Sequence, residues 1–184
     1  IGKPTNDGKP QGTVSECWAF YPPDSSWSRR ADIPQSMRWP GNIVVGGKLY
    51  VGLSTNVSNS LLENRFHIFD PKTNKWTKSS DLTLKYVNAL RPATFANGTS
   101  IFVLDFDNNF YAYDVISDKW SVKTSPKFSQ RYLSSFVSTA NKGIVIGGVK
   151  NGFPPTNDCW EYDFSKDIWT QLADMPTVGK YTMA

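Results

Sequence analysis

The sequence has 184 residues, which is enough chain for one sizeable domain with a real core. Aromatic residues make up 14% of it and hydrophobic residues 39%, so the composition is not that of a disordered segment. The net charge of +4 is small and the Lys and Arg residues form no dense basic run, so nucleic-acid binding is not implied. No apolar stretch reaches the roughly 18 residues that a membrane-spanning helix needs, and no signal peptide is visible.

A ten-residue pattern occurs four times along the chain and ends each time in Trp. Its copies are WAFYPPDSSW (18–27), HIFDPKTNKW (67–76), YAYDVISDKW (111–120) and WEYDFSKDIW (160–169). The closing residues Trp27, Trp76, Trp120 and Trp169 are 49, 44 and 49 positions apart. A period of this size is the signature of a repeat architecture.

Each copy of the pattern predicts a β-hairpin. Ring side chains stand nine and seven positions before the closing Trp, so they share one face of a strand. An Asp follows in three copies, where its carboxylate can bond to nearby backbone N–H groups of a turn: Asp70, Asp114 and Asp163. The closing Trp then opens the second strand and faces back across the hairpin, as the packing element between neighbouring sheets.

Two further strands are predicted before the second, third and fourth copies. They lie within 41–53, joined by Gly46-Gly47; within 92–106, joined around Asn97-Gly98; and within 134–148, joined around Asn141. Four short strands in each unit of about 47 residues, with no helical period, predict an all-β fold built of propeller blades.

At these residues the sequence resembles the kelch repeat family. The resemblance rests on Gly147-Gly148 after an apolar strand, on Tyr113-Asp114 and Tyr162-Asp163, and on the Trp six residues after each Asp. It implies a kelch-type β-propeller with blades of four antiparallel strands. The stretch NDCWEYDFSKDIWTQLADMP is most similar to bacterial kelch proteins of the cell envelope, which implies a surface-exposed or periplasmic location. Only one unit keeps the full di-glycine.

The repeat register divides the chain, residues 1–184, into blades. We expect 1–35 to end one blade, 36–82, 83–128 and 129–176 to form three whole blades, and 177–184 to start another. Kelch rings usually have six or seven blades, so we expect about four blades of a larger ring. The remaining blades of the same polypeptide, or a partner, would close that ring. A ring of four blades would lack most of one strand.

Cations followed by rings recur eleven and twelve positions after the closing Trp. They are Arg38-Trp39, Arg131-Tyr132 and Lys180-Tyr181, with Arg91 near the place where the third blade breaks the pattern. We expect them on a rim formed by the loops between the second and third strands and between blades, where they suit anionic or sugar-like groups. In kelch domains similar to this one, arginines near this place contact acidic peptides. The alternative is that each cation bonds loop carbonyls and each ring packs the channel.

These features favour a non-catalytic binding or scaffold module for a protein or glycan partner. The predicted loops 53–65 and 148–158 are long while 105–109 is short, and variable loops on a rigid framework are where partners usually bind. The alternative function is a sugar-handling kelch enzyme such as a sialic-acid mutarotase. That enzyme would need a carboxylate beside the cations, for which Glu63 and Glu161 are the Glu candidates.

No metal, cofactor or catalytic residue is predicted. The single histidine, His67, stands in the column of aromatic residues and is expected to pack like one. Asp105, Asp107 and Asn109 have the spacing of a calcium loop but lack its Gly and distant Glu. Cys17 and Cys159 take the same place in blades three apart, too far for a disulfide, and are expected to be free thiols.

Overall fold

The computed structural model describes residues 15–37, 40–55, 62–83, 92–105, 107–132, 134–150 and 154–176. All regular elements in these ranges are β-strands, which confirms the predicted all-β class. No helix in the same ranges is long and apolar enough to cross a membrane.

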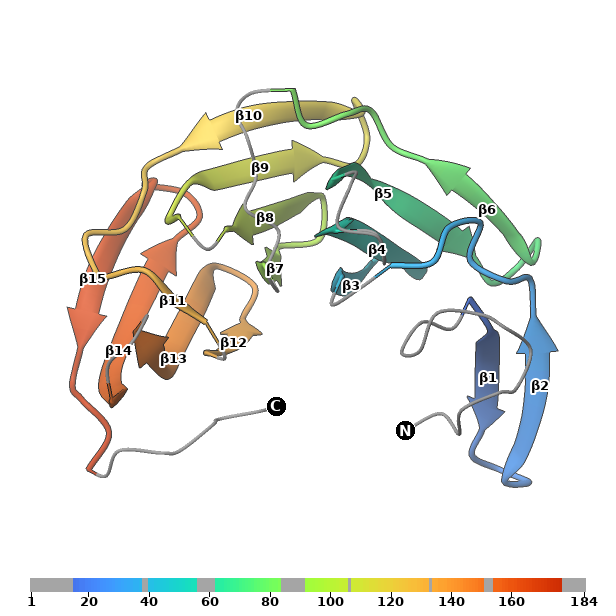
Figure 1. Ribbon diagram of the computed structural model, residues 1–184, viewed down its shortest axis with the longest axis horizontal. Coiled ribbons are helices and arrows are strands. Elements are labelled where there is room, and N and C mark those ends of the chain that lie inside the picture. Colours follow the sequence, from blue (N-terminus) through green and yellow to red (C-terminus); the bar gives the residue numbers. More distant parts are fainter. Residues whose placement is uncertain are drawn as a thin grey trace.

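The strands form four sheets placed one after another around an arc (Figure 1). We call the sheets blades A to D in chain order. Blade A holds β1 (Cys17–Tyr21) and β2 (Ser26–Arg30). Blade B holds β3 (Gly41–Val45), β4 (Lys48–Thr55), β5 (Leu62–Asp70) and β6 (Lys75–Lys78). Blade C holds β7 (Ala93–Ala96), β8 (Ser100–Leu104), β9 (Phe110–Asp114) and β10 (Lys119–Lys123). Blade D holds β11 (Arg131–Tyr132), β12 (Ser135–Ser138), β13 (Lys142–Lys150), β14 (Pro155–Asp163) and β15 (Ile168–Leu172).

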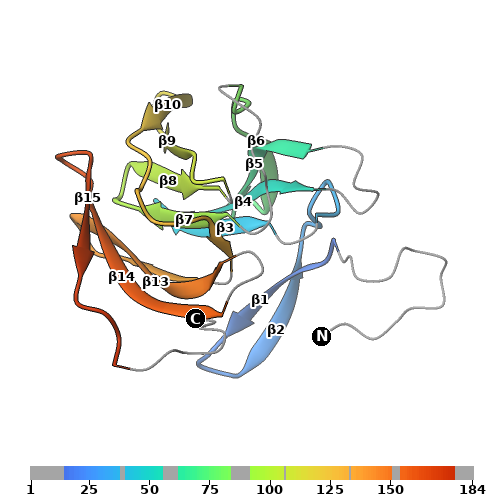
Figure 2. The same cartoon turned by 60° about the vertical axis from the view of Figure 1, so that its left-hand side comes forward.

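Neighbouring strands within each blade are antiparallel, and β3 to β6 and β7 to β10 follow chain order across their sheets. The first strands, β3, β7 and β12, lie on the inner side of the arc, and the last strands lie on its outer side (Figure 1). Figure 2 shows the sheets stacked face to face around the arc. This radial arrangement of antiparallel sheets, with four strands each in blades B and C, is that of propeller blades, as the sequence predicted.

The closing Trp residues take equivalent places in all four blades, which confirms the repeat. Each is the second residue of the outermost strand and lies directly opposite a ring on the strand before it. The centroids of the two rings are 5.0 Å apart in blade A, 5.0 Å in B, 4.9 Å in C and 5.0 Å in D. The hairpin therefore has one geometry, although the ring partner changes between Phe and Tyr.

The hydrophobic core lies between blades, because a two-faced sheet must cover each face with the next sheet. Between B and C, Trp120 stacks on Phe66 with centroids 5.6 Å apart, and Tyr113 lies 5.9 Å from the same ring. Between C and D, Phe110 meets the edge of Tyr162 at 4.6 Å and Trp169 at 5.1 Å. In both cases the Trp and its ring partner face the preceding blade.

A repeated set of hydrogen bonds joins each blade to the one before it. We call the fourth residue after the closing Trp the junction residue; it is Ala31, Ser80 or Thr124 in blades A to C. The Trp Nε1 of the next blade donates to the junction carbonyl: Trp76 to Ala31 at 2.7 Å, Trp120 to Ser80 at 3.1 Å and Trp169 to Thr124 at 2.8 Å.

The junction N–H is satisfied by the same hairpin that supplies the Trp. It donates to a side-chain oxygen two residues before that Trp: Ala31 to Asn74 at 2.9 Å, Ser80 to Asp118 at 2.7 Å and Thr124 to Asp167 at 3.0 Å. These three acceptors all have positive φ, between 54° and 56°. The left-handed turn residue thus aims its oxygen at the neighbouring blade, and Asn and Asp tolerate that conformation well.

A bulge lengthens the hairpin between the second and third strands in blades B and D. The register shifts between Gly52 and Ser54 in B and between Ile146 and Gly148 in D. The bulged residue has positive φ in both, 53° at Leu53 and 58° at Gly147. Leu53 therefore takes the place of the first glycine of the di-glycine, which explains how blade B forms without that motif.

Gly52→Ala should destabilise the protein, because the bulge brings the backbone of β5 against Gly52. A Cβ there would lie 2.0 Å from the Arg65 carbonyl oxygen, a backbone atom that can move only with its strand. We expect a loss of about 3 kcal/mol in the free energy of unfolding, the upper end for overpacking. Gly47→Ala is the matched control, because Gly47 has φ 73° and open space around it. It should lose only about 1 kcal/mol through backbone strain, and equal losses would contradict the steric account.

Candidate functional site

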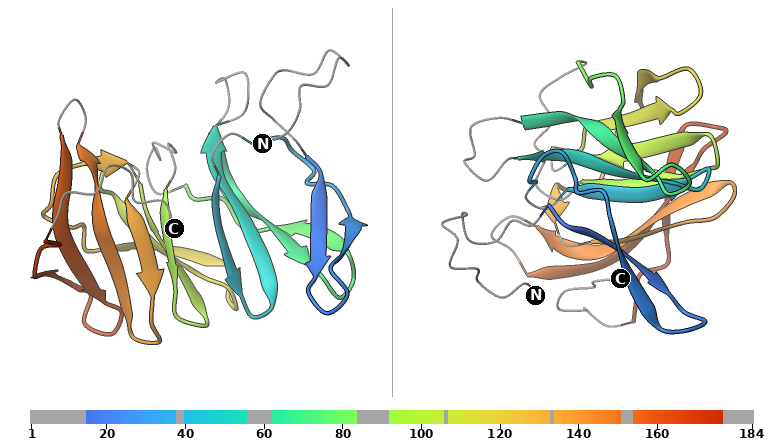
Figure 3. Two further views of the ribbon diagram at one scale, coloured as in Figure 1. Left: turned by 90° about the horizontal axis from the view of Figure 1, so that it is seen from below. Right: turned by 90° about the vertical axis from the view of Figure 1, so that its right-hand side faces the viewer.

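The two sides of the arc differ in what they present. The turns that join first to second strands and third to fourth strands, including Gly46-Gly47 and 115–118, lie together on one side of the arc (Figure 3). The opposite side carries the connections between second and third strands and the connections between consecutive blades. We call its described part in blades C and D the loop rim; it consists of Asp105, 107–109, 126–131 and 155–158.

Arg131 lies at the centre of the loop rim with a nearly fully buried side chain. Its guanidinium forms a two-pronged ion pair with Asp158, with Nη1 to Oδ1 at 2.6 Å and Nη2 to Oδ2 at 2.8 Å. It also donates to the carbonyls of Gly147 at 3.1 Å and Ser129 at 3.2 Å. The guanidinium carbon lies 4.3 Å from the centre of the Phe128 ring. These contacts fix β11, β13 and β14 relative to one another.

Asp158 is held in its charged form by this network. Burial alone would raise the pKa of its carboxyl group, but hydrogen bonds from Arg131, Thr156 and Trp160 outweigh it and hold the pKa well below its ordinary value. Thr156 Oγ1 donates at 2.6 Å and Trp160 Nε1 at 2.8 Å. Asp158 is therefore an ionised anchor of the blade rather than a proton donor.

The predicted cation and ring residues are described in part. Arg38, Trp39, Arg91, Lys180 and Tyr181 lie outside the described residues, and Tyr132 is described only as a β11 residue paired with Val149. Arg131 is the member whose side chain can be placed. Its contacts are those of the alternative in which the cation bonds loop carbonyls. A ligand-binding role for the full set stays a prediction.

A compact polar turn joins β8 to β9 at the rim of blade C. Asp105 is buried and accepts hydrogen bonds from the Asn109 backbone N–H at 2.8 Å and from its side-chain amide at 2.8 Å. Burial raises the pKa of the Asp105 carboxyl despite these bonds. Asn108 donates to the Phe128 carbonyl, which ties the turn to the segment before Arg131. The calcium-like spacing in this stretch is thus used for a turn.

Blade B places an acidic and basic cluster near the bulge. Arg65 Nε lies 3.1 Å from Glu63, and its Nη2 lies 2.8 Å from Asp81. His67 is fully buried in the aromatic column, with Nε2 3.6 Å from Glu63 and no hydrogen-bond partner among the described atoms. Burial lowers the pKa of His67 even though the Glu63 charge opposes the shift, so the imidazole is neutral near pH 7.

Glu161, the second acidic candidate, does not approach Arg131. It lies near the end of β14, two residues before Asp163, and pairs with Lys142 Nζ at 2.8 Å, which also contacts Asp163 at 2.9 Å. Glu63 lies in another blade and is held by Arg65. Within the described part of the chain, neither Glu shares a site with Arg131. No three His, Cys, Asp or Glu side chains described here could hold a metal ion.

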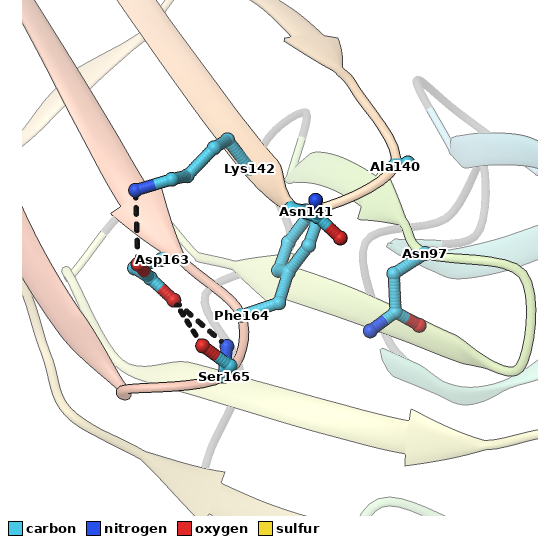
Figure 4. A pocket seen from close by; sticks show the side chains of 7 residues that line it. All are labelled: Asn97, Ala140, Asn141, Lys142, Asp163, Phe164 and Ser165. Carbon is cyan, nitrogen blue, oxygen red and sulfur yellow. Dashed lines mark hydrogen bonds and ion pairs between the residues drawn. The ribbon is translucent and has the colours of Figure 1, made fainter.

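An open cavity of about 470 Å³ lies on the hairpin-turn side, away from the loop rim. Turns of blades C and D line it, through Asn97, Ala140, Asn141, Lys142, Asp163, Phe164 and Ser165 (Figure 4). Its polar groups are engaged locally: the Asp163 carboxylate accepts from Ser165 and Lys142, and Asn97 Oδ1 accepts from the Ser100 N–H. The side chains that line the cavity thus stabilise turns rather than converge on an open centre.

Comparison with known proteins bears on the fold. Residues 130–176, which include blade D, match the family model described as Kelch motif. The solved structure described as "Structure of YjhT" superposes with a TM-score of 0.68 at 20% identity, over 84% of this chain and 57% of that one. The fold is that of a kelch-type β-propeller. The predicted fold and the kelch resemblance are confirmed.

Two curated proteins are similar to this chain in sequence. Kelch-like protein 25 of Xenopus tropicalis is 28% identical over 133 residues, which are 68% of this chain and 21% of that protein. N-(sulfonatooxy)prop-2-enimidothioate sulfolyase of Thlaspi arvense is 26% identical over 161 residues, which are 77% of this chain and 45% of that protein. The kelch-type chain thus spans less than half the length of either curated relative.

Proposed function

We propose that this kelch-type propeller is a binding module that recognises a protein partner through the side of the arc that carries the loop rim. The observation behind the proposal is that the second and third strands remain paired over different lengths in different blades on that side. Beyond their bulges, blades B and D continue pairing to Thr55 with Leu62 and to Val149 with Pro155. Blade C stops at Leu104 with Phe110, at the level where the other two bulge.

Unequal loops on a uniform framework support recognition of a shaped partner. The framework is uniform because the ring-Trp pair has the same geometry in every blade. The charges at this side support the same view. Among the described residues, Arg131 is bound to Asp158, and Glu63 is bound to Arg65. Paired charges of this kind hold loops in place, whereas an acid or base in catalysis needs a free approach to its substrate.

One relative is named as an enzyme and the other as a kelch-like protein, so an enzymatic function remains an outcome to be tested. Its sugar-handling form rests on the sequence resemblance. A glycan partner and the cell envelope as location are proposals that rest on the sequence resemblance alone. The predicted rim residues Arg38, Trp39, Arg91, Lys180 and Tyr181 are proposed contacts on this same side, and Arg131 is proposed to position the loops around them.

Changing exposed residues of the loop rim should weaken partner binding without changing stability. Asp107 and Gln130 are exposed and joined by a hydrogen bond of 3.3 Å, so their double change to Ala removes polar contact area but no core packing. A partner captured by the chain should bind the double variant at least about tenfold more weakly, a cost usual for a central interface pair. The matched control is the double variant Thr73→Ala with Lys75→Ala. Both residues are exposed and lie at the turn between β5 and β6, on the side of the arc opposite the loop rim.

Three results would separate the possible functions. Weaker binding by the rim variant alone supports the proposal. Equal binding by both variants would move the binding surface away from the loop rim and contradict it. Faster interconversion of the anomers of a sialic acid in the presence of the chain, measured by proton NMR, would favour the enzyme alternative.

A further inference from the structure

His67 is buried without a hydrogen-bond partner, which is uncommon for a polar side chain in a folded protein. Its side chain is fully buried, and neither Nδ1 nor Nε2 has a partner among the described atoms. The other blades place Trp18, Tyr111 and Trp160 at this position. An aromatic ring therefore fits here, and among the four blades only blade B supplies one that titrates near neutral pH.

The closest charged neighbours of His67 come from its own strand. Side chains alternate between the two faces of a strand, so Glu63, Arg65 and His67 share one face of β5. Phe66 lies on the other face, against blade C. Glu63 is 3.6 Å from His67 Nε2, but its carboxylate is already held by Arg65 Nε at 3.1 Å. A proton on His67 would therefore compete with Arg65 for this carboxylate.

The neighbouring strands of blade B add positive charge. On β6, Lys78 is directly opposite His67 in the register. On β4, the residue opposite His67 is Val51, which carries no charge. Asp81, which follows β6, lies 2.8 Å from Arg65 Nη2 and neutralises that side chain.

Blade A covers this face of blade B and contributes a further cation. Phe20 and Trp27 pair on the face of blade A that points away from blade B. Because faces alternate, Cys17 and the opposite residue Arg30 lie on the face toward blade B, with Asp32 close to both. Cations on β2, β5 and β6 thus lie on the two facing sides of the interface that buries the imidazole.

This environment opposes protonation of the ring. Burial lowers the pKa of His67 below its ordinary value of 6.5; the Glu63 charge opposes that shift, and the Lys78 and Arg65 charges reinforce it. The folded chain then binds less proton than the unfolded chain below pH 6.5, so the stabilisation is complete above that pH and is lost on acidification. This range lies above the one in which the Asp158 carboxyl titrates, because the pKa of Asp158 is below 3.8.

A hydrogen bond next to these charges holds the end of blade B. Asn64 lies between Glu63 and Arg65, and its carbonyl accepts the Leu82 N–H at 2.6 Å. Leu82 is buried in the same core cluster as Phe66. Blade D has the equivalent bond, from the Met175 N–H to the Asn157 carbonyl at 2.8 Å, but its strand carries Trp160 in place of His67.

We propose that His67 makes the end of blade B sensitive to mild acid, so that uptake of one proton by its ring opens the hydrogen bond between Leu82 and Asn64. The imidazolium draws Glu63 away from Arg65 and repels the Arg65 guanidinium. Asn64 moves with these two residues because it lies between them on β5. The strand begins at Leu62, on the side of the arc proposed to bind a partner, so mild acid alters that side of blade B.

Amide hydrogen exchange followed by NMR tests the proposal, with protection factors that divide out the intrinsic effect of pH on exchange. Between about pH 7.5 and about pH 5.5, the protection factor of the Leu82 N–H should fall at least about threefold, as for a local opening linked to proton uptake. The Met175 N–H should keep its protection factor, because Trp160 does not titrate. The chain alone is measured, so the proposal can fail while the proposed function holds.

Two variants test the cause. His67→Phe keeps an aromatic ring and removes the titratable group, so its Leu82 protection factor should not change over this range. Glu63→Gln should still respond, but at lower pH, because it removes the charge that favours protonation. A constant Leu82 protection factor in the unchanged chain, or an equal fall in His67→Phe, would overturn the proposal. If His67→Phe does not fold, Glu63→Gln decides, and a response at the same or higher pH would overturn it.

Discussion

Replacing Trp120 by Ala is expected to destabilise the protein by about 3–5 kcal/mol, the usual cost of emptying a large aromatic site. Trp120 stacks on Phe66 of the preceding blade with ring centroids 5.6 Å apart and lies 4.9 Å from Tyr113. Its indole N–H also donates to the Ser80 carbonyl at 3.1 Å. The change removes packing and a hydrogen bond from the same junction, so blades B and C lose both. Chemical denaturation followed by circular dichroism measures the loss.

Two further variants place that loss in the junction. Ile116→Ala, on the turn that precedes Trp120, should change stability by no more than about 0.5 kcal/mol, because the side chain is exposed. Trp120→Phe keeps much of the ring packing and loses the indole N–H, so its loss should fall between the two. A Trp120→Ala variant as stable as the unchanged chain would mean that neighbouring blades do not depend on this side chain.

Asp158→Asn is expected to destabilise the protein by about 3–5 kcal/mol, because it leaves a buried cation without its counter-charge. The Arg131 side chain is 3% exposed, so water cannot replace the lost carboxylate. A second variant tests this cause. Arg131→Met combined with Asp158→Asn removes both charges, and apolar replacement of a buried pair is often nearly neutral. The double variant should therefore be more stable than Asp158→Asn alone, and a double variant that is less stable would contradict the ion-pair explanation.

The pair also predicts a pH dependence of stability. The folded-state pKa of Asp158 lies below its ordinary value of 3.8, so the stabilisation is complete above that value. It is lost as the pH falls from about 4 toward the folded-state pKa. Denaturation midpoints between neutral and acidic pH should fall less steeply for Asp158→Asn than for the unchanged chain. An equal slope would show that other carboxylates carry the acid sensitivity.

The fold could be predicted from the sequence because large aromatic residues recur at a nearly constant spacing. The spacing of Trp27, Trp76, Trp120 and Trp169 sets the blade length, and the rings seven positions earlier set the hairpin register. Few arrangements of the sheets other than face-to-face stacking can bury these large rings. The Asp residues of the pattern were also assigned to turns correctly, since Asp70 accepts the Lys72 N–H at 2.9 Å and Asp163 accepts the Ser165 N–H at 3.0 Å.

The junction was not foreseen, although its signal was present. Ser25, Asn74, Asp118 and Asp167 form a column of side-chain oxygens two residues before each Trp. These residues share an acceptor oxygen, but Ser, Asn and Asp all supply one. No single residue type recurs at this position, so the repeat is not evident from residue identity. Its partner is a backbone N–H some 40 residues earlier, and backbone groups leave no mark in a sequence.

The sequence singled out Arg131 as one of a set of recurring cations but did not indicate its partner. Asp158 is 27 positions away on another strand, and the pairing depends on β11 lying beside β13, which then pairs with β14. Equivalent positions do not repeat the pair, because Arg65 and Asn109 stand where blade D has Asp158. Comparison of the repeats cannot predict an interaction that occurs in one blade only.

Amide hydrogen exchange at the junction residues, followed by NMR, is the most direct test of the central claim that one junction joins all the blades. We expect strong protection at Ala31, Ser80 and Thr124, whose N–H groups donate to side-chain oxygens of the next hairpin. Rapid exchange at Ser80 or Thr124 in the folded chain would contradict the account.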